Sequence, residues 1–144
     1  MKLDKIESGN EMMSRNNLGV VTPTQLFLNY MTTAGGKEES DKLLVSLYDI
    51  KHILSQHNIQ TDAVFRGNRK DGNLFSEAIS NELWYWRSNE FIEEHSGYIA
   101  YSHKKGMIRF MSESKIDEKV NWNLSEKVKN ILKQTINTVI KSGK

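Results

Sequence analysis

Two stretches of the 144-residue chain combine basic side chains with turn-forming residues. "RGNRKDGN" at 66–73 is rich in Gly, Asn and Asp and predicts a loop, and "HKKG" at 103–106 predicts the turn of a hairpin. Cations on exposed turns are suited to contacting DNA phosphates, so we predict that both stretches bind duplex DNA if the fold brings them together. The alternative is that both are ordinary solvated turns. The candidate nucleic-acid-binding residues are Arg66, Arg69, Lys70, His103, Lys104, Lys105 and Arg109.

Trp84, Tyr85 and Trp86 form a run of three aromatic residues near the end of a predicted helix. Successive residues of a helix are rotated by about 100°, so the three rings cannot all face one core. Trp86 is predicted to be the core ring, and Trp84 and Tyr85 are predicted to point outward, beside Asn81. Because Trp and Tyr are enriched among interface anchors, Asn81, Trp84 and Tyr85 are the candidate partner-binding residues. The alternatives are that the C-terminal helix or the start of the chain covers the two rings, or that they stack on nucleic-acid bases.

The aromatic helix is poorly suited to enter a DNA groove. It carries Glu77 and Glu82, and Arg87 is its only cation. Carboxylates repel the phosphate backbone. Any DNA contact is therefore expected from the basic stretches rather than from this helix.

Patterns typical of catalysis or metal binding do not occur in the sequence. The chain has no Cys, which excludes disulfides, thiolate metal sites and a cysteine nucleophile. His52 and His57 are spaced i,i+5 and lack the register of an i,i+4 metal pair. Glu93 and Glu94 point to opposite faces of a predicted strand and cannot form a paired acid and base there. We predict that the protein is not an enzyme and needs no metal and no cofactor.

The composition indicates one globular domain. Apolar residues make up 38% and charged residues 26% of the chain, and the formal net charge is +2, too small by itself to indicate a nucleic-acid partner. No apolar run approaches the roughly 18 residues of a spanning helix, and the N-terminus lacks the apolar core of a signal peptide. We expect a cytoplasmic protein with no membrane contact, made of a flexible leader at 1–20 and a single domain at 21–144.

Four helices are predicted to position the candidate residues. The first begins with a capping box of Thr22 and Gln25 and ends at Gly35 and Gly36. Apolar residues recur every three or four positions in the other helices. These are expected at about 40–57, 76–88 and 124–142.

The amphipathic helix at 124–142 is expected to begin at a capping box of Asn123 and Glu126. Its apolar stripe either closes the domain's own core or forms a homodimer contact. Before this helix, alternation with period two predicts three short strands. They are expected at 91–95, 98–102 and 107–111.

Helices followed by a small hairpin give the order of a winged helix-turn-helix domain. The segments "LLVSLYDIKHIL", "LFSEAISNELWYWRSNEFIEE" and "YIAYSHKKG" resemble, over residues 42–110, the Panacea or SocA-like antitoxin-related group of uncharacterised prokaryotic proteins. Phe75 and Ser76 match the turn that precedes that group's second conserved helix, and 102–106 match its wing. The resemblance implies a prokaryotic or prophage regulator, or an antitoxin-like module, rather than an enzyme.

The sequence therefore predicts an α+β, mostly helical fold, with a winged-helix-like core and extra N- and C-terminal helices. The leading hypothesis is a small regulator that binds DNA through its basic wing and loop. The alternative is an antitoxin-like or phage-encoded protein–protein interaction module that uses the aromatic helix face and does not bind DNA.

Overall fold

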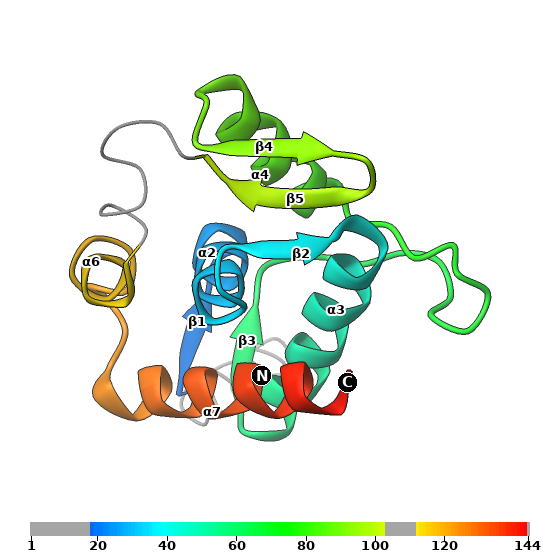
Figure 1. The fold of residues 1–144 in the computed structure, drawn as a ribbon. Helices are drawn as coiled ribbons and strands as arrows, with labels where there is room; N and C mark the ends of the chain where they lie inside the picture. The colour runs from blue at the N-terminus through cyan, green and yellow to red at the C-terminus, as the bar shows by residue number, and fades with distance from the viewer. Residues whose placement is uncertain (1–17, 103–111, 144) are drawn as a thin grey trace, which may run out of the picture.

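The computed structural model describes residues 18–102 and 112–143 of the chain. They form five helices, a small three-stranded antiparallel sheet towards one end of the molecule, and a short parallel strand pair beside the helices (Figure 1). The predicted α+β, mostly helical class is confirmed. The elements of this part run α2–β2–α3–β3–α4–β4–β5, and apart from the short strand β3 this order is consistent with the predicted winged-helix-like core.

Helix α2 (Pro23–Thr33) is the central element of the core. The predicted capping box is confirmed: the Gln25 N–H donates to the Thr22 hydroxyl, and the Thr22 N–H donates to the Gln25 side chain. The helix ends where predicted, because Gly35 and Gly36 both have positive φ, which glycine adopts without strain. Its core side chains, which are fully buried, are Leu26, Phe27, Leu28, Tyr30 and Met31.

Helices α3 (Ser40–Gln56) and α7 (Glu126–Ser142) pack against each other, and α7 also packs on α2. The N-cap of helix α7 lies two residues after the predicted one, because the hydroxyl of Ser125 accepts from the Val128 N–H (3.2 Å). The predicted capping box of Asn123 and Glu126 is therefore wrong. The Asn123 side chain instead accepts from the Gln25 amide (2.8 Å), which ties the start of α7 to the start of α2.

The antiparallel sheet has the strand order β2 (Lys37–Glu39), β5 (Tyr98–Tyr101), β4 (Ile92–His95). The predicted hairpin of β4 and β5 is confirmed, and both residues of its turn have positive φ, 44° at Ser96 and 88° at Gly97. Positive φ at both positions is the requirement of a type I′ turn. The strand predicted at 107–111 lies outside the described residues. The third strand among the described residues is β2, which pairs with β5.

Three further elements were not predicted. Strands β1 (Gly19–Val21) and β3 (Ile59–Thr61) form the parallel pair, so the expectation of a flexible leader as far as residue 20 is wrong at its last two residues. Residues 1–17 lie outside the described residues. Helix α6 (Glu113–Lys119) occupies a segment interpreted from sequence as a polar spacer.

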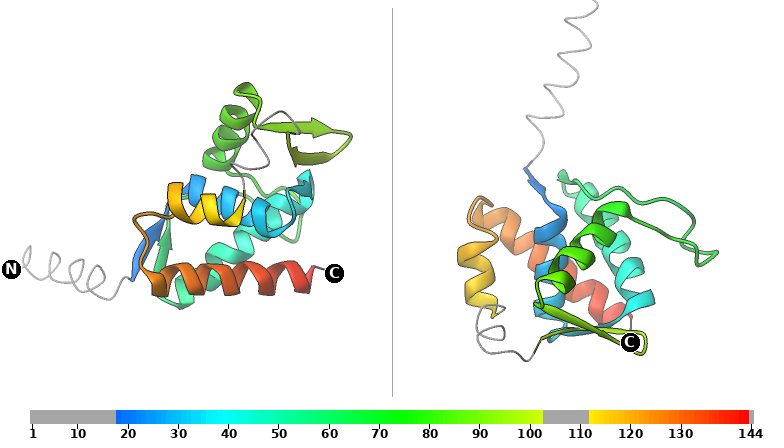
Figure 2. Two further views of the ribbon diagram at one scale, coloured as in Figure 1. Left: turned by 60° about the vertical axis from the view of Figure 1, so that its left-hand side comes forward. Right: turned by 90° about the horizontal axis from the view of Figure 1, so that it is seen from above.

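Helix α4 (Glu77–Ser88) and the β4–β5 hairpin lie together at one end of the molecule, and α7 lies at the opposite end (Figures 1 and 2). Helix α4 contacts α2 and β4. We refer to residues 76–102 as the α4–hairpin unit. Its position leaves one side of α4 facing away from the core.

Candidate functional site

Helix α4 begins at Ser76, whose hydroxyl accepts from the Ile79 N–H (3.3 Å). Glu77 in the first turn complements the positive end of the helix dipole. All twelve residues of α4 are described, and only Ile79 is fully buried. Ala78, Leu83 and Trp86 pack against the core while partly exposed. The helix therefore buries a narrow stripe.

Trp86 connects α4 to the hairpin. Its ring lies edge-on to Phe91, with the centroids 5.0 Å apart, and edge-on to Tyr85 at 5.1 Å. The Trp86 indole N–H donates to the Glu82 carboxylate (3.0 Å). Trp86 is thus the inward ring, as its helical position predicts, and it packs edge-on with Tyr85.

Trp84 and Tyr85 face outward, with 63% and 47% of their surfaces exposed. The prediction from helical geometry is confirmed. The alternative that α7 covers the two rings is wrong, because α7 lies at the other end of the molecule (Figure 2). Asn81 is exposed and lies one helical turn before both rings, so the three candidate partner-binding residues share one surface. We call Asn81, Trp84 and Tyr85 the aromatic face.

The unit that carries this face is rich in acidic residues, and sequence reasoning considered only the charge of those on the helix itself. The α4–hairpin unit has a formal charge of −4 with His95 neutral, in a chain whose net charge is +2. Its one arginine, Arg87, forms an ion pair with Glu94 (3.2 Å). The acidic residues of the unit are Glu77, Glu82, Glu90, Glu93 and Glu94.

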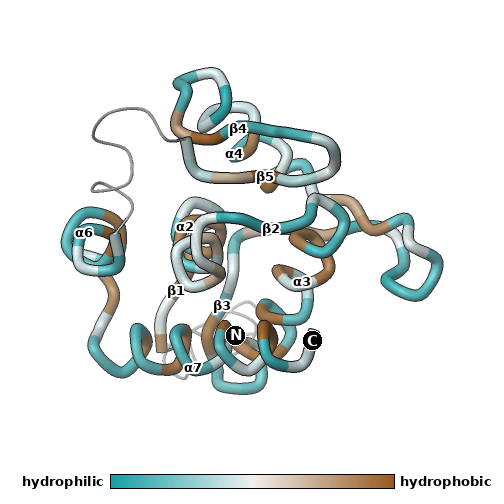
Figure 3. Tube along the Cα trace, viewed as in Figure 1, coloured by the Kyte–Doolittle hydropathy of each residue, from teal (hydrophilic) through white to brown (hydrophobic). Residues whose placement is uncertain are grey.

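The loop at 66–73 projects from the molecule and is mainly hydrophilic (Figure 3). Arg69 does not point freely into solvent, because its guanidinium makes two hydrogen bonds to the carboxylate of Asp49 on α3 (2.9 and 3.0 Å). These bonds raise the pKa of Arg69 above its ordinary value. Asp49 was missed from sequence, since nothing in the spacing links it to Arg69.

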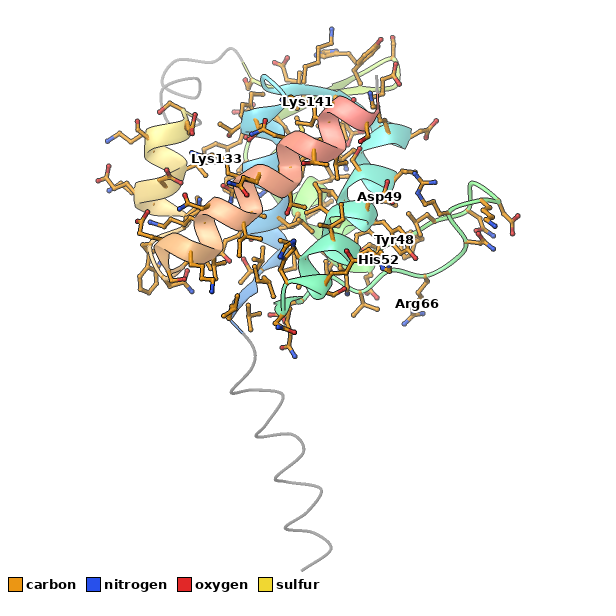
Figure 4. The ribbon with its side chains drawn as sticks, turned by 90° about the horizontal axis from the view of Figure 1, so that it is seen from below. Tyr48, Asp49, His52, Arg66, Lys133 and Lys141 are labelled. Atoms are coloured by element: carbon orange, nitrogen blue, oxygen red, sulfur yellow. The ribbon has the colours of Figure 1, made fainter. Side chains whose placement is uncertain are left out.

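The other two basic residues of this loop are exposed. Arg66 is held through its backbone, which pairs with Phe75 in both directions (2.7 and 2.8 Å), and its side chain extends outward (Figure 4). Lys70 is exposed near the tip of the loop. Of the seven candidate nucleic-acid-binding residues, the remaining four, His103, Lys104, Lys105 and Arg109, lie outside the described residues. Whether loop and wing share a surface stays a prediction.

Helix α7 uses its apolar stripe inside the chain. Of the two interpretations made from sequence, the closing helix is the one observed, because the stripe packs on α3 and α2 and is not presented to a second copy. Lysines occupy its outer face, where Lys133 and Lys141 are visible (Figure 4). The buried residues of α7 are Val128, Leu132, Thr135, Ile136 and Val139.

A cavity of about 340 Å³ lies between α3, α7 and the loop. Its charged lining is largely paired: Asp49 binds Arg69, and the Lys42 ammonium donates to the Gly143 carbonyl (3.2 Å). Among the described residues no group of three or more His, Cys, Asp or Glu side chains is arranged to hold a metal ion. None of the described helices combines the length and the apolar content needed to cross a bilayer.

Comparisons of the chain with protein-family models, with curated proteins and with solved structures found no match.

Proposed function

We propose that this chain is a protein-interaction module that binds a protein partner through the aromatic face of α4. The observation that carries the proposal is the joint exposure of Trp84 and Tyr85 on a helix whose inner side is already packed. An aromatic side chain buries 150–250 Å² when a partner covers it. Tryptophan and tyrosine are also enriched among the hot-spot residues that supply most of the binding energy of an interface. Rings that the described part of the fold leaves in water are well suited to be covered by another protein.

The rigidity of the face supports the same proposal. Tyr85 and Phe91 each pack edge-on with Trp86, and the Asn89 amide donates to the Tyr85 carbonyl (2.8 Å). A surface that is ordered before binding loses little conformational entropy when the partner arrives. An antitoxin-like or phage-encoded role would fit such a module and stays a prediction.

Photocrosslinking followed by affinity measurement tests this function. A photoreactive amino acid at Asn81 should crosslink a cellular partner, whereas the same group at the exposed Asn137 on α7 should not. With the purified partner, Trp84→Ala should weaken binding by about 30-fold or more, as expected for a hot-spot tryptophan. The matched control is Trp122→Ala, which removes an indole that is 75% exposed near the start of α7. Equal affinities of the Trp84 and Trp122 variants would contradict the proposal.

Binding of duplex DNA is the second candidate, favoured by the helix–strand–helix–helix–hairpin order of the core. Lys104→Glu combined with Lys105→Glu should abolish binding, and the affinity of the parent should fall steeply with salt. Arg69 adds a sharper test, because Asp49 now neutralises it. If Arg69 contacts phosphate, Asp49→Asn should tighten DNA binding. Unchanged binding in the double lysine variant would contradict the wing model.

A further inference from the structure

We infer that the cavity between α3, α7 and the loop at 66–73 is a binding site for a small organic acid. The apolar body of the acid lies against valine and isoleucine side chains, and its carboxylate accepts hydrogen bonds from Lys42 and Arg69. This inference goes beyond the proposed function and does not depend on it, because α7 lies at the opposite end of the molecule from the aromatic face (Figure 2). It follows from the size of the cavity, its apolar walls and the hydrogen-bond donors of its lining.

One wall of the cavity is a face of α3 that is separate from the core face of that helix. The core face consists of Leu43, Leu47, Ile50 and Leu54, which are at most 1% exposed. The side chains on the cavity side recur every three or four positions and so share the neighbouring face of the helix, where Figure 4 labels two of them. The core does not use this face, which leaves it available to a ligand. Its residues are Lys42, Val45, Ser46, Asp49, His52 and Ile53.

The walls of the cavity are largely apolar. Val45 and Ile53 of α3 are partly exposed, and Val139 in the last turn of α7 lines the cavity as well, with 7% of its surface exposed. The loop contributes Arg69 to the lining. A volume of about 340 Å³ lies within the range of about 300–1,000 Å³ that is typical of small-molecule sites. The cavity therefore suits a short aliphatic or aromatic group.

The hydroxyl groups of the lining do not offer their hydrogens to a ligand. Thr138 and Ser142 each donate to a carbonyl one turn earlier in α7, both at 2.9 Å. Ser46, which is 5% exposed, is hydrogen-bonded to the Tyr30 hydroxyl. Because Tyr30 itself donates to Glu38, Ser46 is the donor of that bond. The strongest donors that the lining offers to a ligand are therefore its cationic groups.

Lys42 and Arg69 supply these donors, although each already has a partner. The Lys42 ammonium uses one N–H on the Gly143 carbonyl (3.2 Å), and the Arg69 guanidinium uses its Nε and Nη2 groups on Asp49 (2.9 and 3.0 Å). Both groups have more N–H donors than these bonds to described residues use. Charge-assisted hydrogen bonds to a carboxylate are roughly twice as strong as neutral ones. An acid is therefore favoured over an amine, which would meet two cations and a carboxylate that Arg69 already occupies.

NMR titration of the full chain with sodium hexanoate, hexanol and hexylammonium chloride tests the inference. The three probes share an alkyl chain and differ in the head group. Hexanoate should shift the methyl signals of Val139 and reach saturation at millimolar concentration, whereas the other two should bind about fivefold more weakly or less. The control signals are the methyls of Val128, which is buried on the same helix, about 16 Å away along its axis, and does not line the cavity. They should stay in place.

Substitutions then locate the carboxylate of the ligand. Arg69→Gln and Lys42→Gln each remove a charged donor and should weaken hexanoate about threefold or more. Asp49→Asn removes the carboxylate that engages Arg69 and should tighten hexanoate about twofold or more. The control is Lys141→Gln, which removes an exposed lysine of α7 outside the lining and should change the affinity by less than about twofold. The methyl spectrum of each variant without ligand shows that it is folded.

The contradicting outcomes do not involve the proposed function. Hexanol or hexylammonium that binds as tightly as hexanoate would overturn the acid as the ligand. A hexanoate titration that leaves Val139 unmoved, or that moves Val139 and Val128 alike, would overturn the binding site. So would parental affinity for hexanoate in both Arg69→Gln and Lys42→Gln. The crosslinking experiment at Asn81 decides the proposed function by itself, whatever the cavity binds.

Discussion

Helices α4 and α7 lie at opposite ends of the molecule and divide their residues between inside and outside in different ways (Figure 1). Each begins at a serine cap, Ser76 for α4 and Ser125 for α7. Helix α7 buries five side chains, whereas α4 fully buries only Ile79 among its twelve described residues. The core of the chain therefore covers the apolar stripe of α7, whereas it leaves the two outer rings of α4 exposed.

The outer faces of the two helices also differ, in this case in their charge. Helix α7 carries four lysines and one glutamate, a formal charge of +3, while the α4–hairpin unit carries −4. Lysines are common on solvated helix faces because the ammonium stays in water. Two exposed aromatic rings among carboxylates are not typical of such a face. The comparison teaches that α7 serves the fold, and it supports the proposal that the outer side of α4 contacts another protein.

The largest effect is expected when the inner face of α7 is truncated. Leu132 is 1% exposed, so Leu132→Ala should lower the free energy of unfolding by about 3 kcal/mol through lost burial and an added cavity. The control on the outer face is Asn137→Ala, which should change it by less than about 0.5 kcal/mol. Urea denaturation of both variants measures the difference. Equal losses would mean that α7 is not the closing helix of the core.

A smaller loss is expected from the inner ring of α4. Trp86 is half-buried and contacts Phe91 and Tyr85, so Trp86→Ala should cost about 2 kcal/mol, less than for a fully buried tryptophan. Trp86→Phe keeps a ring in the stack but loses the hydrogen bond to Glu82, and should cost about 1 kcal/mol. Thermal and urea unfolding of the two variants give these values. A loss in Trp86→Ala as small as that of an outward ring would contradict the division of α4 into two sides.

Tyr101 attaches the hairpin to α2, and its contribution to the free energy of unfolding should depend on pH. Its hydroxyl lies 2.7 Å from that of Thr32 and donates to the Leu28 carbonyl (3.1 Å), and burial raises its pKa above the ordinary value. Tyr101→Phe should therefore cost about 1 kcal/mol at neutral pH.

The sign of the pH effect follows from the raised pKa. The folded state favours the neutral phenol, so the contribution is fully present below pH about 10 and is lost as the pH rises further. Tyr101→Phe should flatten part of this alkaline loss. Urea midpoints between neutral pH and pH about 11 measure it, and parallel curves for parent and variant would contradict the assignment.

The smallest of these stability effects is expected at the basic loop. Arg69 and Asp49 form a two-bond pair at the surface, with half of the arginine side chain exposed. Arg69→Ala should lower the free energy of unfolding by less than about 1 kcal/mol, because water screens the pair. High salt should shrink the difference further. A loss above about 2 kcal/mol would show that the loop is part of the core.

The elements that could be predicted from sequence are those with local signals. The capping box of Thr22 and Gln25, the glycines that end α2 and the Ser96–Gly97 turn are all encoded within a few neighbouring residues. The outward position of Trp84 also follows from helical geometry alone. These features therefore appear in the structure where the sequence places them.

The missed elements depend on contacts between distant parts of the chain. Strand β2 is "KEE", three charged residues with no apolar alternation, and it forms because β5 offers it a partner. The pairing of Arg69 with Asp49 joins residues twenty positions apart. Asn123 looked like a helix cap, but Gln25, ninety-eight residues away, engages its side chain. Sequence spacing carries no information on such pairings, so the electrostatics of the basic loop could not be anticipated.

The free energy of unfolding of Trp84→Ala tests the central claim most directly. If the outer ring of α4 contributes nothing to the chain's own fold, the variant should unfold within about 0.5 kcal/mol of the parent, with a slight gain because alanine is the better helix former. Trp122→Ala should behave in the same way, since its indole is exposed as well. A loss of about 3 kcal/mol or more in Trp84→Ala would mean that the ring belongs to the core, and the account of a partner-binding face would be wrong.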